Sequence, residues 1–366
     1  MHQLPAYATD QVRSLYEAMH YNLAVQAILE GSVPAEIYVD TVDHPRVALT
    51  WHGGRVFLAG SPGDGAFNER LPHSLAELAP ASDAFVLYYE PAGAWEETLD
   101  GLLADLDPIR AGREYYRLEL PGSRKGPAPP AMPEGFSLRY VDDELLTDET
   151  LGNRDDLIEE LCSERESVAD FLEKSFGYCL LHGNDVAGWC LSEYNTADRC
   201  EVGIATFEPH RRQDLATATG SALLDQAASR GITEVGWHCY ASNVASAATA
   251  RKLGFAKRVE YPVRFAYFDA TINQAVHGNI AFQRGEYDRA LTRYKEAMVR
   301  GDTPLWVFWN AACASARLGR RTAALDYLVQ AVDRGFDDLE RLLASEHLTS
   351  LHDTEGWQAL TRRLQA

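Results

Sequence analysis

The stretch "EVGIATFEPHRRQDLATATG", Glu201–Gly220, decides how this chain is interpreted. An apolar, strand-like run leads into a basic turn and then into small helix-forming residues. The start of a helix has unpaired N–H groups and a partial positive charge, which together favour a pyrophosphate. Arg211 and Arg212 add two charged donors beside it. The sequence therefore predicts an anion-binding helix start.

Asp214 stands where such a loop normally carries glycine. A carboxylate near a diphosphate repels it by about 1 kcal/mol or more at surface dielectric. Aspartate is, however, among the few residues that tolerate the left-handed conformation, and it also caps helices. A side chain turned outward, or paired with Arg211 or Arg212, leaves the N–H groups free. We therefore predict an anion site that is weakened but not abolished.

Composition places the chain among soluble globular proteins of two or three domains, with 366 residues, 46% hydrophobic and 24% charged. The formal net charge of -20 argues against a nucleic-acid partner. It permits a cationic substrate such as an amine, although acidity alone more often serves solubility. The acidic composition thus disfavours nucleic acid as a partner and leaves the identity of the substrate open.

Targeting and metal signals are lacking in the sequence. The first residues contain no continuous apolar segment, and no run approaches the roughly 20 apolar residues that a membrane helix requires. The six cysteines form no C-x-x-C pair, and His347 and His352 lack companion ligands. We expect a cytoplasmic protein with no metal site and no membrane partner.

Three segments and a linker follow from the pattern of strands, helices and loops. Residues 1–120 read as a small α/β domain, and the Pro- and Gly-rich residues 121–135 as a linker. Residues 136–268 repeat the α/β theme. Residues 269–366 read as helices, so that the fold class expected is α/β with an added helical region.

The third segment contains an internal repeat. Gly285 and Gly319 are 34 residues apart, and so are Ala290 and Ala324. A period of 34 residues with alanines at the helix crossing is typical of tetratricopeptide (TPR) repeats. The tail departs from this period and is expected to cap the stack. Such repeats suggest a protein partner or self-association, while the aromatic run Trp306–Trp309 is more simply repeat core.

A second motif, "ASNVASAATARKLGF", places Asn243 eleven residues before Gly254. Together with the opening stretch it resembles the GNAT acyltransferase family, whose members move an acetyl group from acetyl-CoA to an amine. The sequence pattern of these two stretches is similar to that of the subgroup that includes the zwittermicin-resistance acetyltransferase. The resemblance covers residues 136–268 well, the first segment weakly and the repeats not at all. It implies a mixed-sheet GNAT fold, with residues 1–120 as a degenerate GNAT-like half.

The resemblance also implies a set of cofactor-binding residues. The family's R/Q-x-x-G-x-G/A turn corresponds to Arg211–Ala216, and the strand before it and the second motif supply further contacts. Asn243 and Ser246 match positions that contact coenzyme A, although Asn243 also reads as a simple helix cap. The residues expected to bind acetyl-CoA are Ile204, Ala205, Thr206, Arg211, Arg212, Gln213, Asp214, Leu215, Ala216, Thr217, Asn243 and Ser246.

Acyl transfer needs a base for the amine, a polarised thioester carbonyl and a proton for the departing thiolate. In GNAT folds the strand before the loop commonly bears the base, and here that position points to Glu201, which otherwise reads as a solvent-facing charge. His238 is a second candidate base, or a structural histidine. The family's usual acid, a tyrosine, is replaced by Ala250, so Tyr240 or solvent must supply the proton.

Two functions follow from these observations. The first is an N-acetyltransferase that uses acetyl-CoA and a small-molecule amine in a ternary complex. The alternative is a weak or inactive GNAT domain that acts as an acyl-CoA sensor, or as a scaffold through its TPR repeats. Binding of acetyl-CoA and turnover on amines would discriminate between them.

Overall fold

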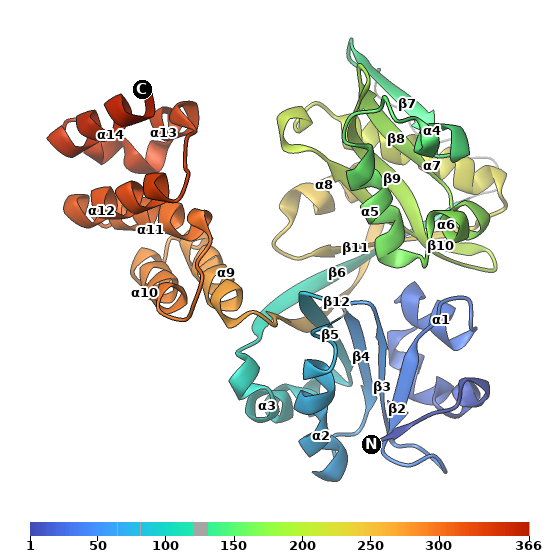
Figure 1. The fold of residues 1–366 in the computed structure, drawn as a ribbon. Helices are drawn as coiled ribbons and strands as arrows, with labels where there is room; N and C mark the ends of the chain where they lie inside the picture. The colour runs from blue at the N-terminus through green and yellow to red at the C-terminus, as the bar shows by residue number, and fades with distance from the viewer. Residues whose placement is uncertain (64, 81, 121–130, 366) are drawn as a thin grey trace. The chain divides into compact units, whose positions relative to one another are not determined.

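The computed structural model describes residues 1–63, 65–80, 82–120 and 131–365, except the side chains of residues 6 and 7. Its strands form one twelve-stranded sheet in the order β1-β2-β3-β4-β5-β12-β6-β11-β10-β9-β8-β7 (Figure 1). The strands are β1 (His2–Gln3), β2 (Glu36–Val39), β3 (Val47–His52), β4 (Arg55–Gly60), β5 (Ala84–Glu90), β6 (Ile109–Glu119), β7 (Phe136–Tyr140), β8 (Gly177–His182), β9 (Asp185–Thr196), β10 (Arg199–Thr206), β11 (Glu234–Tyr240) and β12 (Ala256–Tyr267).

Helices connect these strands and fill the C-terminal region. Those between strands are α1 (Leu23–Leu29), α2 (Gly65–Ala76), α3 (Ala92–Leu102), α4 (Asp143–Thr147), α5 (Arg154–Glu164), α6 (Val168–Lys174), α7 (Leu215–Ser229) and α8 (Val244–Lys252). The C-terminal ones are α9 (Ala270–Gln283), α10 (Tyr287–Met298), α11 (Leu305–Arg317), α12 (Arg321–Asp333), α13 (Leu339–Ala344) and α14 (Glu355–Gln365). Short 3₁₀ helices are η1 (Ala6–Gln11), η2 (Arg13–Met19), η3 (Ala104–Leu106), η4 (Glu208–His210) and η5 (Glu346–Leu351).

Contacts divide the chain into two compact units. The first comprises residues 1–75, 86–102 and 110–265 and holds nearly all of the sheet. The second comprises residues 76–85, 103–109 and 266–366. No helix among the described residues is long and apolar enough to cross a membrane.

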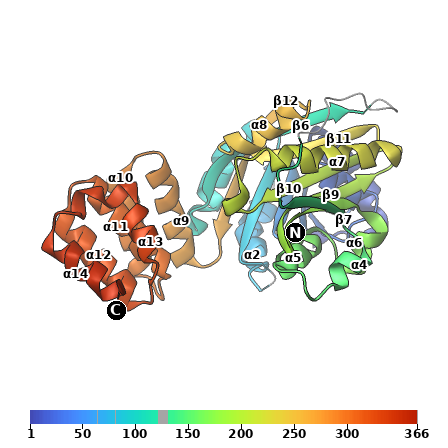
Figure 2. The ribbon, with the colours of Figure 1, turned by 90° about the horizontal axis from the view of Figure 1, so that it is seen from above.

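Helices cover both faces of the sheet in the middle segment (Figure 2). α7 and α8 pack on one face, where Leu223 and Leu253 join a core with Trp237. α5 and α6 pack on the other face, where Leu157 and Phe171 belong to a second apolar cluster. Burial of these apolar side chains from both sides accounts for the near-continuous hydrophobic runs of β9, β10 and β11.

The first and middle segments have the same element order and exchange their last strands. β4-α2-β5-α3-β6 in the first segment corresponds to β10-α7-β11-α8-β12 in the middle one. β4 pairs with β5 in parallel, and so does β10 with β11. Yet β6 lies beside β11, and β12 lies beside β5. Each half thus donates its final strand to the sheet of the other half.

This exchange changes how the predicted boundary at residue 121 is understood. The described contacts place residues on both sides of it in one unit, because β6 lies between β12 and β11. Residues 1–120 are therefore not a separately packed domain. Of the predicted linker, residues 121–130 lie outside the described residues. Two 3₁₀ helices, η1 and η2, precede α1 in this segment.

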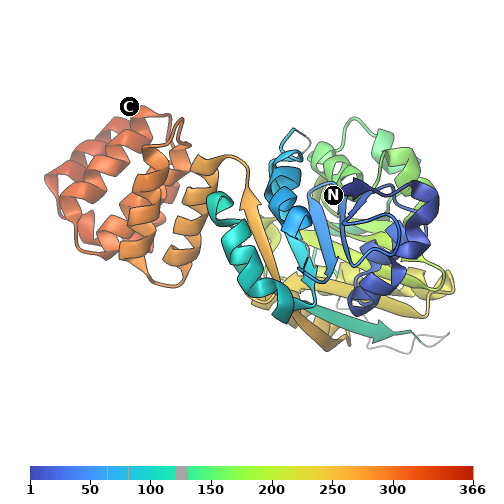
Figure 3. The same ribbon diagram turned by 90° about the horizontal axis from the view of Figure 1, so that it is seen from below.

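The C-terminal helices pack against one another in pairs (Figure 3). α9 and α10 pack together, and α11 packs on α12. Gly285 and Gly319 follow α9 and α11 at φ of 76° and 71°, a left-handed conformation that suits glycine after a helix. Ala290 and Ala324 are completely buried. These helices agree with the predicted 34-residue period, while their assignment as TPR repeats stays a prediction.

Candidate active site

The two central strands of the middle segment separate where the site begins. β10 pairs with β11 only from Arg199↔Glu234 to Val202↔Trp237. On its other side, β10 stays paired with β9 as far as Thr206↔Gly188. A bulge in that pairing falls between Glu201 and Val202. Among the described residues, the β11-facing backbone of residues 203–206 therefore has no strand partner, and it can hydrogen-bond an extended ligand.

The corresponding strands of the first segment do not separate. β4 and β5 are paired from Arg55↔Val86 to Ala59↔Glu90, at the end of β4. The fully buried Trp95 of α3 donates its indole N–H to the carbonyl oxygen of Gly60, 2.9 Å away. An opening between strands is thus found in the middle segment and is closed in the first one.

Asp214 takes the role of the missing glycine in the turn before α7. It has a φ of 59°, and Arg212 has a φ of 64°, so both residues are left-handed. The Asp214 side chain forms no capping hydrogen bond. Its Oδ1 instead lies 2.6 Å from Nζ of Lys252 on α8. The outward orientation is as predicted, but the partner is Lys252 and neither of the neighbouring arginines.

The start of α7 offers free donors to a ligand. The first helical bond runs from the N–H of Ala218 to the carbonyl of Asp214. The N–H groups of Leu215, Ala216 and Thr217 precede it, and no described residue accepts a hydrogen bond from them. Leu215 and Thr217 are buried and Ala216 is partly exposed. This geometry fits an anion at the helix start.

The basic turn lies at the surface next to this helix start. Arg211, Arg212 and Gln213 are exposed. Nε of Arg211 donates to the carbonyl oxygen of Thr206, 2.9 Å away. Ile204, Ala205 and Thr206 are half-buried on the unpaired part of β10. The structure therefore brings the predicted cofactor residues of β10, the turn and α7 together.

Asn243 and Ser246 hold the start of α8. Oδ1 of Asn243 accepts from the N–H of Ser246 at 3.0 Å, which confirms the predicted cap. Oγ of Ser246 accepts from Nε1 of Trp237, also at 3.0 Å. Both side chains have structural partners here. A contact between them and coenzyme A stays a prediction.

Glu201 is buried, so its alternative interpretation as a solvent-facing charge is wrong. Its side chain is 4% exposed, and its Oε2 accepts from the N–H of Leu23 at the start of α1. Burial would raise the pKa of Glu201, but Nε2 of His238, 3.4 Å from that oxygen, together with Arg55 and the Leu23 N–H, holds the pKa below its usual value. Such a carboxylate is a weak base.

His238 is fixed on both ring nitrogens. Nε2 lies 3.3 Å from the carbonyl oxygen of Tyr21, which can only accept, so Nε2 carries a proton. Nδ1 lies 2.6 Å from the hydroxyl of Tyr261. With both nitrogens engaged, His238 is placed to hold Glu201 and Tyr261 rather than to take a proton from a substrate.

Tyr240, the candidate acid, packs beside a partly buried arginine. The guanidinium carbon of Arg113 lies 4.8 Å from the ring centre of Tyr240. Burial raises the pKa of the Tyr240 hydroxyl, and Arg113 opposes that rise. Ala250, at the position of the family's tyrosine, is completely buried in the α8 core. The acid role of Tyr240 stays a prediction.

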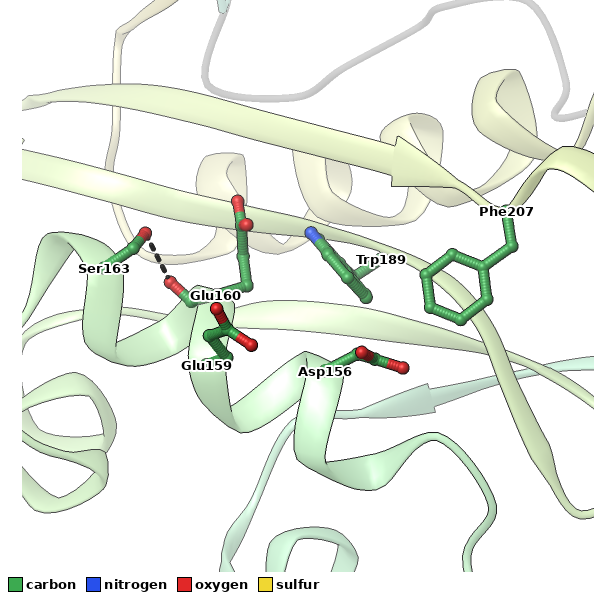
Figure 4. Close-up of a pocket in the computed structure, with 6 residues that line it drawn as sticks. All are labelled: Asp156, Glu159, Glu160, Ser163, Trp189 and Phe207. Carbon is green, nitrogen blue, oxygen red and sulfur yellow. Dashed lines mark hydrogen bonds between the residues drawn. The ribbon is translucent and has the colours of Figure 1, made fainter. Parts of the chain in front are cut away.

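An acidic pocket opens on the α5 face of the sheet, beside the end of β10 (Figure 4). Its volume is about 340 Å³. It is lined by Asp156, Glu159, Glu160, Ser163, Trp189 and Phe207. No described residue forms an ion pair with its three carboxylates. The rings of Trp189 and Phe207 meet edge to face, with centroids 5.5 Å apart.

Trp189 also brings its indole N–H to the wall of this pocket. Its side chain is almost completely buried, yet Nε1 has no hydrogen-bond partner among the described residues. In Figure 4 this nitrogen points toward the carboxylate of Glu160. Burial raises the pKa of Glu160 and the neighbouring Glu164 raises it further, while the indole N–H of Trp189 and the guanidinium of Arg55 oppose the rise. Carboxylates and aromatic rings together suit a cationic ligand.

Sequence reasoning missed the acidic side of the site. Glu159 and Glu160 of α5 and Glu193 of β9 were not among the predicted site residues. One signal was available: Trp189, Leu191 and Glu193 alternate along β9, so a glutamate falls on an otherwise apolar face. Among the described residues, no group of three or more acidic, His or Cys side chains is arranged to hold a metal ion.

A mixed sheet whose central parallel strands part above an anion-binding helix start defines the GNAT class of acyltransferases. The chain belongs to this family: the model for GNAT acetyltransferases matches residues 13–264. The match includes the first segment, in agreement with the shared sheet.

The chain is also similar to a curated protein in sequence and to a solved structure in fold. The chain is 27% identical over 257 residues to the uncharacterized N-acetyltransferase YdfB of Bacillus subtilis strain 168, covering 70% of this chain and 94% of that protein. The crystal structure of a GCN5-related N-acetyltransferase-like protein from Streptococcus suis 89/1591 is similar in fold, with a TM-score of 0.53 and 22% identity. That likeness covers 72% of this chain and 99% of the other. The chain is therefore an acyltransferase enzyme.

Proposed function

We propose that this chain transfers the acetyl group of acetyl-CoA to the amine of a small cationic molecule within a ternary complex. The observation that carries the proposal is that β10 separates from β11 after Val202. The chain then leads to the first turn of α7, whose N–H groups have no partner among the described residues. The same arrangement is closed in the first segment, so one cofactor site per chain is expected.

Acetyl-CoA fits the residues present at this site. The N–H groups of residues 215–217 and the side chains of Arg211 and Arg212 would hold the pyrophosphate. The unpaired backbone of residues 203–206 would hydrogen-bond the amides of the pantetheine arm, as a neighbouring strand would. The cofactor supplies a reactive thioester. The ion pair of Lys252 with Asp214 offsets the repulsion that the carboxylate would otherwise exert.

The acceptor would enter the acidic pocket from the α5 face. Asp156, Glu159 and Glu160 present negative charge there, and Trp189 and Phe207 add aromatic surface. A protonated amine is stabilised by both features. The indole N–H of Trp189, which faces Glu160 without a close hydrogen bond to it, would donate to a hydroxyl or carbonyl oxygen of the same molecule. Polyamines and amino alcohols match this combination, whereas an amine that also carries a carboxylate is disfavoured.

The cofactor site is tested by moving one charge along α7. Ala216→Glu places a carboxylate among the free N–H groups, and Gln226→Glu adds the same charge near the other end of the helix. Calorimetric titration with acetyl-CoA is expected to show at least tenfold weaker binding for Ala216→Glu and no change for Gln226→Glu. The unliganded Ala216→Glu variant should be as stable as the parent, because an acidic residue suits a helix start.

Absence of any acetyl-CoA binding by the parent protein at millimolar concentration would contradict the proposal, since a ligand of the folded state must also raise its melting temperature. Equally weakened acetyl-CoA binding in both variants would show that the phosphates do not lie at the start of α7.

We further propose that the C-terminal helices α9–α12 are TPR repeats that bind a protein partner or a second copy of the chain. Their 34-residue spacing supports this assignment. Sedimentation of the full chain and of residues 1–268 tests self-association: a larger assembly is expected for the full chain alone. Monomers in both cases would exclude it.

A further inference from the structure

Three carboxylates, one buried and two largely buried, gather between α5, β9 and β10, next to the acceptor pocket. The side chains of Glu164, Glu193 and Glu201 are 12%, 16% and 4% exposed. Glu160 lines both the acceptor pocket and a small recess whose wall includes Glu164 and Glu193. The cluster therefore adjoins the pocket in which the amine would lie.

Arg55, on β4 of the first segment, lies among these middle-segment carboxylates. Its guanidinium forms a close ion pair with Glu164, and its Nη2 lies 3.8 Å from Oε2 of Glu193. The hydroxyl of Tyr194 also donates to Glu164. Glu164 is thus strongly paired and Glu193 only weakly. Because unpaired buried charges are costly, Glu193 is the carboxyl in this cluster that keeps a proton most readily.

Glu193 is also placed at the point where β10 leaves β11. Its Oε1 lies over the α-carbon of Gly203, where a Cβ atom would come within 1.9 Å of it. Gly203 is the first β10 residue beyond the last described β11 pair, Val202↔Trp237. A carboxyl here adjoins both the opening between the strands and the acceptor side. Glycine at 203 makes this approach possible.

We propose that Glu193 is the general base of the transfer reaction and that Arg55 of the first segment is its positioning residue. This inference rests on the proposed N-acetyltransfer. The carboxylate of Glu193 takes one proton from the ammonium group of the acceptor. The amine nitrogen then bonds to the acetyl carbon and the carbon–sulfur bond breaks. The second proton of the nitrogen passes to the sulfur, so that coenzyme A leaves as the thiol. The proton on Glu193 passes to solvent.

The surroundings set the affinity of Glu193 for that proton. Burial raises its pKa to about 8, and the nearby Glu164 adds to the rise, while Arg55 opposes it. A base with a pKa near the working pH transfers protons most effectively. The charged or titratable side chains around it are Arg55 from β4, Glu160, Glu164 and Arg165 beside the recess, Tyr194 from β9 and Glu201 from β10.

The test is the pH dependence of kcat/KM, measured as thiol release from acetyl-CoA with spermidine, for the parent, Glu193→Gln, Arg55→Met and Arg55→Lys. Glu173→Gln, an exposed glutamate of α6, is the matched control. We expect Glu193→Gln to lower kcat/KM about 100-fold or more and to abolish the rise of activity through pH 8. Its Kd for acetyl-CoA should equal that of the parent.

Arg55→Met should move the rise of activity to higher pH, because the positive charge that favours the Glu193 carboxylate is gone. Arg55→Lys keeps this charge if the Met variant fails to fold, and it should shift the profile less. A purely structural role for Arg55 would change the rate without moving the pH profile.

Each failure has a distinct signature. Parent-like kcat/KM and pH dependence in Glu193→Gln would overturn the base role, and so would a loss of activity that merely follows a loss of acetyl-CoA binding. A parent protein that binds acetyl-CoA but acetylates no amine would overturn the proposed function itself.

Discussion

Nζ of Lys252 on α8 lies 2.6 Å from Oδ1 of Asp214, the left-handed residue that precedes α7. The two side chains are 51% and 60% exposed, so the pair stabilises the fold by less than about 1 kcal/mol. Its main effect is electrostatic. It neutralises a carboxylate at the site where a pyrophosphate would bind.

Asp214→Gly is expected to tighten acetyl-CoA binding several-fold. Glycine adopts a φ of 59° without strain, and the change removes a negative charge and frees Lys252. Lys252→Ala should weaken binding, because Asp214 is then unpaired, and the exposed Lys295→Ala in α10 is its control. Calorimetric titration measures all three. Weaker binding by Asp214→Gly would show that the carboxylate itself supports the turn.

The acidic pocket is expected to control the KM for the acceptor. Asp156→Asn and Glu159→Gln should each raise the KM for spermidine about three- to tenfold with little change in kcat, and less so at high salt. Asp155→Asn, a neighbour on α5 that does not line the pocket, is the matched control. The parent should also prefer spermidine to β-alanine. Unchanged KM values in both variants would show that the acceptor does not bind in this pocket.

Glu193 should also reveal its raised pKa in the stability of the protein. A carboxyl whose pKa rises on folding stabilises the native state fully below about pH 4.5, and that contribution is lost as the pH rises to about 8. The melting temperature of Glu193→Gln relative to the parent should therefore increase steadily across this window. A constant difference between pH 5 and 8 would mean that Glu193 is already ionised in the native state.

The strand exchange predicts that neither half of the sheet folds alone. Residues 1–120 and 131–366, produced separately, should each lack a cooperative thermal transition, because β6 and β12 would have no sheet to join. Mixing the two pieces during refolding should restore the transition. A cooperative melt of residues 1–120 alone would instead support the independent domain predicted from the sequence.

The sequence sufficed for the parts of the site that lie on one continuous stretch. The turn from Arg211 to Asp214, the cap at Asn243 and the alternating strands around them are local patterns, and the structure places them as expected. The left-handed conformation of Asp214 was also foreseeable from its residue type. Its partner was not, because Lys252 is 38 residues away in sequence.

Contacts between residues far apart in the chain explain the remaining differences between the sequence-based predictions and the structure. The exchange of β6 and β12 leaves no trace in local periodicity, so a Pro- and Gly-rich connection was interpreted as a domain boundary. The pairing of Arg55 with Glu164 and Glu193 likewise depends on residues far away in the chain. Glu201 looked like a catalytic base from its position alone, while its burial and its bond to the N–H of Leu23 depend on residues far away in the chain.

The most direct test of the central claim is mass spectrometry of spermidine incubated with acetyl-CoA and the purified 366-residue chain. The proposed function predicts acetylated spermidine that accumulates with enzyme concentration, saturates in both substrates and falls by at least tenfold with Ala216→Glu. The Gln226→Glu variant should match the parent. Binding of acetyl-CoA without acetylation of spermidine or of any other amine in a panel would contradict the claim and leave a sensor in place of an enzyme.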